Sequence, residues 1–147
     1  MLKKELYELF DNKLEICSKS KPSIVLRDIA SFLTQPGLIN IEVKDLKKLI
    51  HSSKRMIAMS AKARGNKRSH KIGREIISNI GNIFRVKKAT YVLFNITGSP
   101  DLTLYEVNEV ANYIFNVITS DANIVFGALI DENKKDYINA TVIFGRK

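Results

Sequence analysis

The order of the apolar segments after residue 54 constrains the fold of this chain more than any other feature of its sequence. Short apolar runs with strand character alternate with longer segments in which apolar residues recur every three or four positions, as in amphipathic helices. Strands are predicted over residues 55–61, 91–96, 123–130 and 137–144, and helices over 67–79 and after Thr103. This order predicts an α+β fold in which two helices pack on one mixed sheet of about four strands.

Two local patterns support these assignments. Thr103 and Glu106 have the Thr-x-x-Glu spacing of a capping box, which marks the start of a helix. The predicted strand 55–61 is largely apolar on both faces, which is typical of a strand inside a covered sheet. We therefore expect this strand to be buried on both sides.

The region before residue 54 is less regular. Residues 1–16 alternate weakly between apolar and charged positions and fit a short helix or an edge strand equally well. A helix is expected over about 23–33 and another over 44–52, each with an apolar stripe. With 147 residues, 45% of them hydrophobic, the chain is large enough for one domain with a real core and an extra N-terminal element.

Several classes of protein and site are excluded or disfavoured by composition. The single Cys17 rules out an internal disulfide, and neither His51 nor His70 lies at metal-ligand spacing from it, so no metal site is expected. Both histidines lie among lysines and are expected on the solvated surface. No apolar run reaches the length of a transmembrane helix, and the N-terminus leads into no signal-peptide core. We therefore expect a cytoplasmic protein.

Positive charge is concentrated in the middle of the chain. The net charge is +9, and residues 44–88 hold fourteen cations against two carboxylates, whereas residues 1–43 are balanced and 89–147 are slightly acidic. A high content of Lys, Ile and Asn, as an AT-rich genome would produce, is a competing explanation. Charge of this kind can meet the phosphates of nucleic acid or an anionic membrane.

Six of these cations fall within thirteen residues and form the candidate anion-binding set. Its members are Lys62, Arg64, Lys67, Arg68, Lys71 and Arg74. Residues 45–82 contain no Phe, Tyr or Trp, so the usual platform for base stacking is missing there, and contact with a duplex backbone remains possible. The alternative is an ordinary solvated, lysine-rich face.

The stretch Pro36–Leu46 is the most informative candidate site. An apolar run meets a Pro-Gly pair, and one amide and two carboxylates follow just ahead of a helix. From the residues alone, Asn40 is a good helix N-cap, and Glu42 lies in the first helical turn, where the helix dipole favours negative charge. The pattern therefore fits either ordinary helix capping or a loop with carboxylate chemistry.

This stretch resembles the acidic synergy loop of FtsZ, the bacterial tubulin homologue, whose pattern is P-G-L-I-N-x-D-F-x-D. Four further segments resemble FtsZ motifs in the same order: Gly65–Arg68, Phe94–Gly98 with Asp101–Val107, Ala122–Asp131 and Thr141–Ile143. The resemblance covers about three quarters of the chain and implies the fold of the FtsZ and tubulin C-terminal domain, preceded by a shortened central helix. The basic middle region departs from FtsZ proteins, which are usually acidic.

In this family the GTPase site is divided between subunits, one holding GTP and the next inserting the acidic loop to orient the attacking water. The resemblance assigns that role in trans to Asn40, Glu42 and Asp45. Glu42 stands where the family usually has Asp, and the extra methylene displaces the carboxylate by about 1 Å, which can cost ~10²-fold in rate. The implied partner is full-length FtsZ or another copy of this chain, and GTP is held by the partner subunit.

The rest of the FtsZ pattern is absent from this sequence. We expect residues 1–35 to be a remnant of the end of the GTP-binding domain and of the central helix, and 36–147 to be the C-terminal-like domain. No glycine-rich phosphate loop is present, and the helix before Pro36 is about three turns short. We therefore expect no cofactor, no small-molecule substrate and no GTPase activity for the chain alone. Three functions stay open: contributing to or capping the FtsZ GTPase site, binding nucleic acid or anionic membrane, and an inactive remnant.

Overall fold

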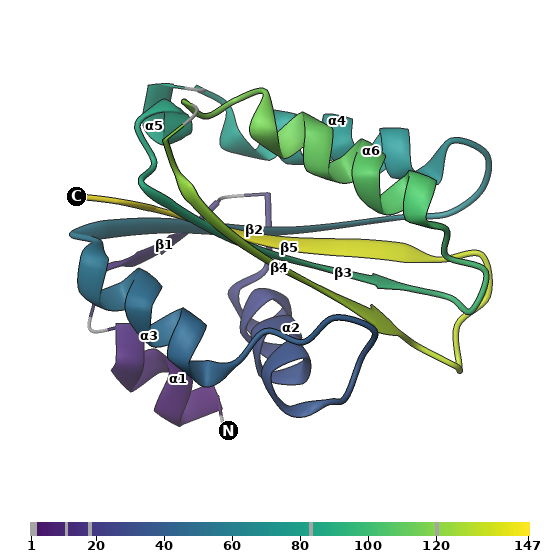
Figure 1. Cartoon of the computed structure of the whole chain (residues 1–147), viewed down its shortest axis with the longest axis horizontal. Coiled ribbons are helices and arrows are strands. Elements are labelled where there is room, and N and C mark those ends of the chain that lie inside the picture. Colours follow the sequence, from purple (N-terminus) through teal and green to yellow (C-terminus); the bar gives the residue numbers. More distant parts are fainter. Residues whose placement is uncertain (1–2, 11, 18, 83, 120) are drawn as a thin grey trace.

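The chain folds into one sheet with helices on both faces (Figure 1). The computed structural model describes residues 3–10, 12–17, 19–82, 84–119 and 121–147. In chain order the elements are α1 (Lys3–Phe10), β1 (Leu14–Ile16), α2 (Pro22–Thr34), α3 (Val43–Ser52), β2 (Arg55–Ala63), α4 (Arg68–Ile80), α5 (Phe84–Lys87), β3 (Tyr91–Gly98), α6 (Leu104–Phe115), β4 (Asn123–Ile130) and β5 (Ile138–Arg146). The α+β class predicted from the sequence is confirmed.

The sheet is mixed, as predicted. Its strand order is β1-β2-β5-β3-β4, with β1 parallel to β2, β3 parallel to β4, and β5 antiparallel to both of its neighbours. Four long strands match the predicted ones, and the three-residue β1 is a fifth strand, at the edge beside β2. Residues 1–16 thus contain both alternatives left open by their pattern, a helix and then an edge strand.

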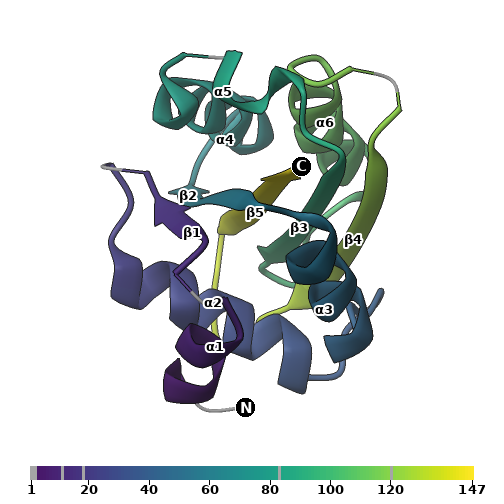
Figure 2. The same cartoon turned by 90° about the vertical axis from the view of Figure 1, so that its left-hand side faces the viewer.

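Helices cover the two faces of the sheet as separate layers. Figures 1 and 2 show α4, α5 and α6 on one face and α1, α2 and α3 on the other. Alternate residues of β2 point into the two cores: Met56 and Ala58 into the α1–α3 layer, Met59 and Ala61 into the α4–α6 layer. The prediction that this strand is covered on both faces is confirmed, because all four side chains are buried.

The N-terminal segment is an integral part of the α1–α3 layer. Helix α1 forms here because Leu6 and Phe10, one helical turn apart, are both buried against α2 and α3. Burial of such side chains stabilises the fold by about 1.5–3 kcal/mol each. Among the described residues no helix is long and apolar enough to cross a membrane.

Candidate functional site

The connection from α2 to α3 is held against the end of β4. The backbone N–H groups of Leu38 and Ile39 both donate to the carbonyl oxygen of Ala128, at 2.9 and 3.2 Å, and the Ala128 N–H donates to the Ile39 carbonyl oxygen at 2.9 Å. Ile41, next along the loop, is buried in the α1–α3 core. The loop is therefore an ordered extension of the sheet edge, with its backbone fixed by pairing.

Two glycines allow this close approach. A Cβ on Gly37 would lie 2.6 Å from the Ala128 carbonyl oxygen, and a Cβ on Gly127 would lie 3.0 Å from the carbonyl oxygen of Ile39. Both distances are too short for ordinary carbon–oxygen contact, so any larger residue would push loop and strand apart. The Pro-Gly pair that marks a turn in the sequence is thus also a contact with β4.

The amide of Asn40 stabilises the loop itself. Its Oδ1 accepts a hydrogen bond from the Gly37 N–H at 2.8 Å. The prediction that Asn40 caps the following helix is wrong, because α3 begins at Val43 with Glu42 as its N-cap residue. The Gly37 N–H faces Asn40 across the turn and is the nearer donor for its short side chain.

The two carboxylates of the loop have different environments. Asp45 lies in the first turn of α3, and its Oδ2 accepts a hydrogen bond from the Glu42 N–H at 3.0 Å. Burial, and then the negative charge of Asp45, raise the pKa of Tyr91 above its ordinary value. The Glu42 side chain is 63% exposed. It takes part in a capping box with Asp45 at the start of α3, and the Lys44 Nζ is 3.5 Å from its Oε2. An exposed pair of this kind contributes at most about 1 kcal/mol, so Glu42 can exchange Lys44 for another partner.

The surroundings of Glu42 suit a contact surface more than a closed active site. Asn40 and Glu42 line one shallow hollow of about 400 Å³ between the end of α2 and the start of α3, and Asp45 is outside it. Leu38, at the tip of the loop, is 69% exposed. Among the described residues no cluster of side chains that could hold a metal ion is found. What the loop presents is an exposed apolar side chain, Leu38, and an exposed carboxylate, Glu42, on a backbone held by hydrogen bonds.

The candidate anion-binding set separates into an exposed group and one buried member. Its exposed members are Lys62, Arg64, Lys67, Lys71 and Arg74. The side chain of Arg68 is only 6% exposed and lies between α4 and α6, so it cannot meet a large anion. The structure therefore reduces the set to five exposed cations.

Arg68 joins two segments that the sequence analysis treated as separate motifs. Its Nε and Nη2 donate to the two carboxylate oxygens of Glu106 at 2.6 and 2.9 Å. Its Nη1 also donates to Ser99 at 3.2 Å and lies 3.3 and 3.5 Å from carboxylate oxygens of Asp101 and Asp136. The turn 65–68 and the segment 101–107 thus meet through one guanidinium. In the sequence, both segments belong to the same set of FtsZ-like motifs, and this was the signal for the contact.

These contacts shift the pKa values of Arg68, Glu106 and Asp101. The hydrogen bond from Arg68 is the main cause that holds the pKa of Glu106 below its usual range, and the same bond raises the pKa of Arg68. The pKa of Asp101 is lowered first by the Ser99 hydroxyl and then by the charge of Arg68. All three groups are charged at neutral pH, and a bidentate arginine–carboxylate pair is a strong contact.

The two histidines differ in how exposed they are. His51 is exposed, as predicted. The prediction is wrong for His70, which is half-buried on α4 and whose Nδ1 hydrogen bonds with the hydroxyl group of Tyr113 on α6. The sequence neighbours of His70 are charged, but helical geometry turns this position toward α6.

A comparison with protein families finds a match to the C-terminal domain of the FtsZ family over residues 54–146. Two curated relatives are cell division proteins FtsZ. The one from Magnetospirillum gryphiswaldense is 33% identical over 119 residues, which are 80% of this chain and 21% of that protein. The one from Wolbachia pipientis is 29% identical over 141 residues, which are 95% of this chain and 42% of that protein. This chain therefore spans less than half the length of either relative.

Solved structures show the same fold. Two FtsZ structures from M. jannaschii, a mutant and an empty dimer, align with TM-scores of 0.70 and 0.64 at 20% and 23% identity. Both alignments cover 97% of this chain, and they cover 50% and 43% of those chains. A protofilament of TubZ from Bacillus thuringiensis serovar israelensis aligns with a TM-score of 0.62 at 17% identity, covering 83% of this chain and 34% of that one.

Proposed function

Because the chain belongs to the FtsZ family, we propose that its loop 36–46 binds the nucleotide-bearing end of an FtsZ subunit and contributes carboxylates to the GTPase site formed there. The observation that carries this proposal is the exposed Glu42, 63% accessible, on a loop whose backbone is pinned to β4. GTP is held by the partner subunit in this scheme, and this chain supplies only the acidic side.

Asn40, Glu42 and Asp45 have different roles in this scheme. Glu42 is the carboxylate that reaches the partner and orients the attacking water. Asp45 keeps the start of α3 in place through its bond to the Glu42 N–H, and Asn40 keeps the turn closed through its bond from Gly37. Phosphoryl transfer needs positioning and charge more than covalent chemistry, so one exposed carboxylate on a fixed loop is a sufficient contribution.

Binding through this single surface has a consequence for filaments. A head-to-tail interface propagates only when every subunit carries both complementary surfaces. The polypeptide of 147 residues has the acidic loop but no glycine-rich phosphate loop. Added to full-length FtsZ, it occupies the nucleotide-bearing end and stops further addition, so it shortens filaments below equimolar ratios.

A mixing experiment tests this proposal. Full-length FtsZ and GTP are combined with increasing amounts of the chain while light scattering and phosphate release are followed. Glu42→Gln removes the exposed charge without enlarging the side chain, and we expect it to lower turnover at the capped end more than it weakens binding. Glu75→Gln, an exposed carboxylate on α4, is the matched control. Filament mass and length unchanged at equimolar chain would contradict the capping mechanism.

The exposed basic residues support a second candidate function, binding to the backbone of duplex nucleic acid. The set of Lys62, Arg64, Lys67, Lys71 and Arg74 is exposed at the end of β2, in the turn that follows it and on α4. Binding by such contacts weakens steeply with salt and has little sequence preference. A triple charge reversal at Lys67, Lys71 and Arg74 should abolish it. If the unmodified chain retains no duplex at about 50 mM salt, this surface is a solvated face. Anionic vesicles provide the parallel test for a membrane surface.

A further inference from the structure

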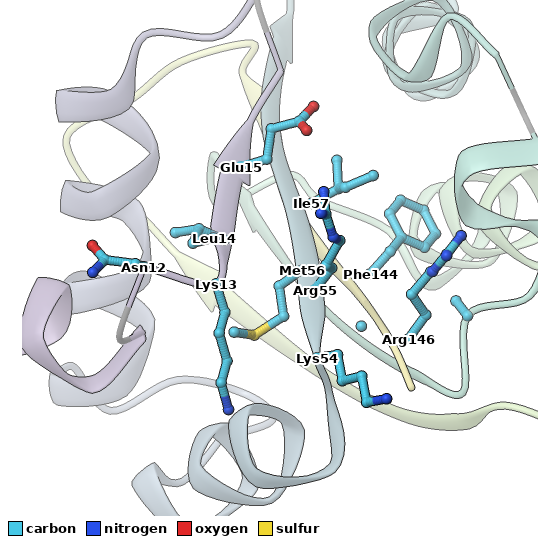
Figure 3. A pocket seen from close by; sticks show the side chains of 12 residues that line it. Asn12, Lys13, Leu14, Glu15, Lys54, Arg55, Met56, Ile57, Phe144 and Arg146 are labelled. Atoms are coloured by element: carbon cyan, nitrogen blue, oxygen red, sulfur yellow. The ribbon is translucent and has the colours of Figure 1, made fainter.

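A second hollow lies at the end of the sheet where β1, β2 and β5 meet. Its volume is about 630 Å³, within the usual range of roughly 300–1,000 Å³ for small-molecule sites. Lys54, Arg55 and Arg146 line it together with one carboxylate, Glu15 (Figure 3). Lys13 also contributes, but its Nζ donates to the Ile50 carbonyl oxygen at 3.5 Å and points toward α3. The balance of charge in this hollow favours an anion.

The two arginines stand directly opposite each other. Arg55 and Arg146 are paired in the antiparallel register of β2 and β5, so their side chains leave the same face of the sheet. Like charges in this position destabilise a strand pair. Within the described part of the chain, neither guanidinium has a hydrogen bond or ion pair to another residue. An anion between them would relieve their repulsion and satisfy their donors.

The backbone around the hollow is fixed, and apolar side chains lie next to the arginines. Ile57 and Phe144 are the register partners two residues further along the same face; Phe144 is only 2% exposed, whereas Ile57 is half-buried and accessible. The strand ends are tied by backbone hydrogen bonds of 2.8 Å from Lys54 N to the Arg146 oxygen and from Thr90 N to the Gly145 oxygen. The two arginines therefore extend from a backbone that is fixed by hydrogen bonds, with Ile57 as the accessible apolar side chain beside them.

We propose that this hollow binds the phosphate group of a small organic phosphate monoester. Arg55 and Arg146 hold the phosphate oxygens, since guanidinium forks match phosphate geometry and two cations match its charge. Glu15, on the other side of β2 from Arg146, disfavours a second phosphate there. The organic part lies on Ile57, a partly exposed apolar side chain of the lining. This site is separate from the basic set on α4, because Arg55 and Lys62 lie seven residues apart on β2, or ~23 Å.

Calorimetric titration of the whole chain tests the site, with phenyl phosphate as the ester and inorganic phosphate as the free anion. The key variant carries Arg55→Gln and Arg146→Gln. The control carries Lys67→Gln and Lys71→Gln, which remove the same charge from the start of α4 and the residue before it. We expect one saturable site for phenyl phosphate, at least tenfold weaker in the key variant and changed less than threefold in the control. Inorganic phosphate should bind more weakly than the ester.

Thermal unfolding without ligand establishes that the variants fold. Removing the opposed charges should leave the melting temperature of the key variant equal to or above that of the unmodified chain. The proposal is overturned if the unmodified chain shows no saturable binding at millimolar phenyl phosphate, if both double variants weaken binding equally, or if the two probes bind alike. FtsZ is absent from this assay, so its outcome is independent of the function proposed for loop 36–46.

Discussion

Replacing Arg68 by alanine should destabilise the chain by about 3 kcal/mol. The change removes two charge-assisted hydrogen bonds to Glu106, of 2.6 and 2.9 Å, from a site where the arginine side chain is 6% exposed and the glutamate 15%. Such bonds contribute about 1.5–3 kcal/mol each. Glu106 keeps its bond from the Thr103 N–H at 3.1 Å and some access to water, so the lower end of the range applies.

Urea unfolding measures this loss. With a slope of about 2 kcal/mol/M, a loss of 3 kcal/mol moves the midpoint down by ~1.5 M without changing the slope. Arg74→Ala removes an exposed arginine from the same helix and should change stability by no more than about 0.5 kcal/mol. Arg68→Lys keeps the charge but not the planar fork, and should fall between the two.

One outcome would refute the reasoning. If Arg68→Ala costs less than about 1 kcal/mol, or no more than Arg74→Ala, the Arg68–Glu106 pair contributes no net stability to the fold. Its attraction would then be cancelled by the desolvation of the two charges, as happens for some buried ion pairs. In that case the contact of α4 with α6 would depend on apolar packing, chiefly of Ile72 and Ile76 with Val110 and Ile114.

Two further predictions follow from the same contacts. Because folding lowers the pKa of Glu106, this group stabilises the folded chain above the ordinary carboxyl value of 4.5, and the stabilisation is lost as the pH falls through the lowered pKa. Between pH 5 and 3 the unmodified chain should therefore lose more stability than Arg68→Ala, as measured by urea unfolding. Gly127→Ala should lower the free energy of unfolding by about 1–3 kcal/mol and weaken FtsZ binding, because the new Cβ would press on the Ile39 carbonyl oxygen and the Asn95 side chain. Gly81→Ala controls for backbone strain alone, because a Cβ there meets no atom within 4 Å but φ is +71°.

Local patterns predicted the elements that depend on local forces. The capping box at Thr103 forms as expected, with the Glu106 N–H donating to the Thr103 hydroxyl oxygen at 3.2 Å and the Thr103 N–H to Glu106. The strands were placed within a few residues of their observed bounds because their apolar patterns continue on both faces. That strands β2 to β5 form one mixed sheet was likewise predicted, but their order in the sheet was not.

The misses involve partners distant in sequence. Arg68 was grouped with surface cations because its neighbours are charged, whereas Glu106, thirty-eight residues away, accounts for its burial. Asn40 is a different case, because its partner is near in sequence: its Oδ1 accepts from the Gly37 N–H three residues away and does not cap the helix. Strand β1 exists because β2 offers it an unpaired edge, which a three-residue segment does not reveal. Local sequence cannot supply these tertiary contacts.

Site-directed cross-linking tests the central claim, binding of loop 36–46 to the nucleotide-bearing end of FtsZ, most directly. The native Cys17 is buried, so Leu38→Cys adds an exposed thiol at the loop tip, where the leucine is 69% exposed. Labelled with a photoreactive maleimide and mixed with full-length FtsZ and GTP, this variant should cross-link to the nucleotide-binding domain of its partner, as identified by peptide mass spectrometry. Glu75→Cys on α4 should not. Absence of the Leu38→Cys cross-link, or equal cross-linking from both positions, would contradict the account.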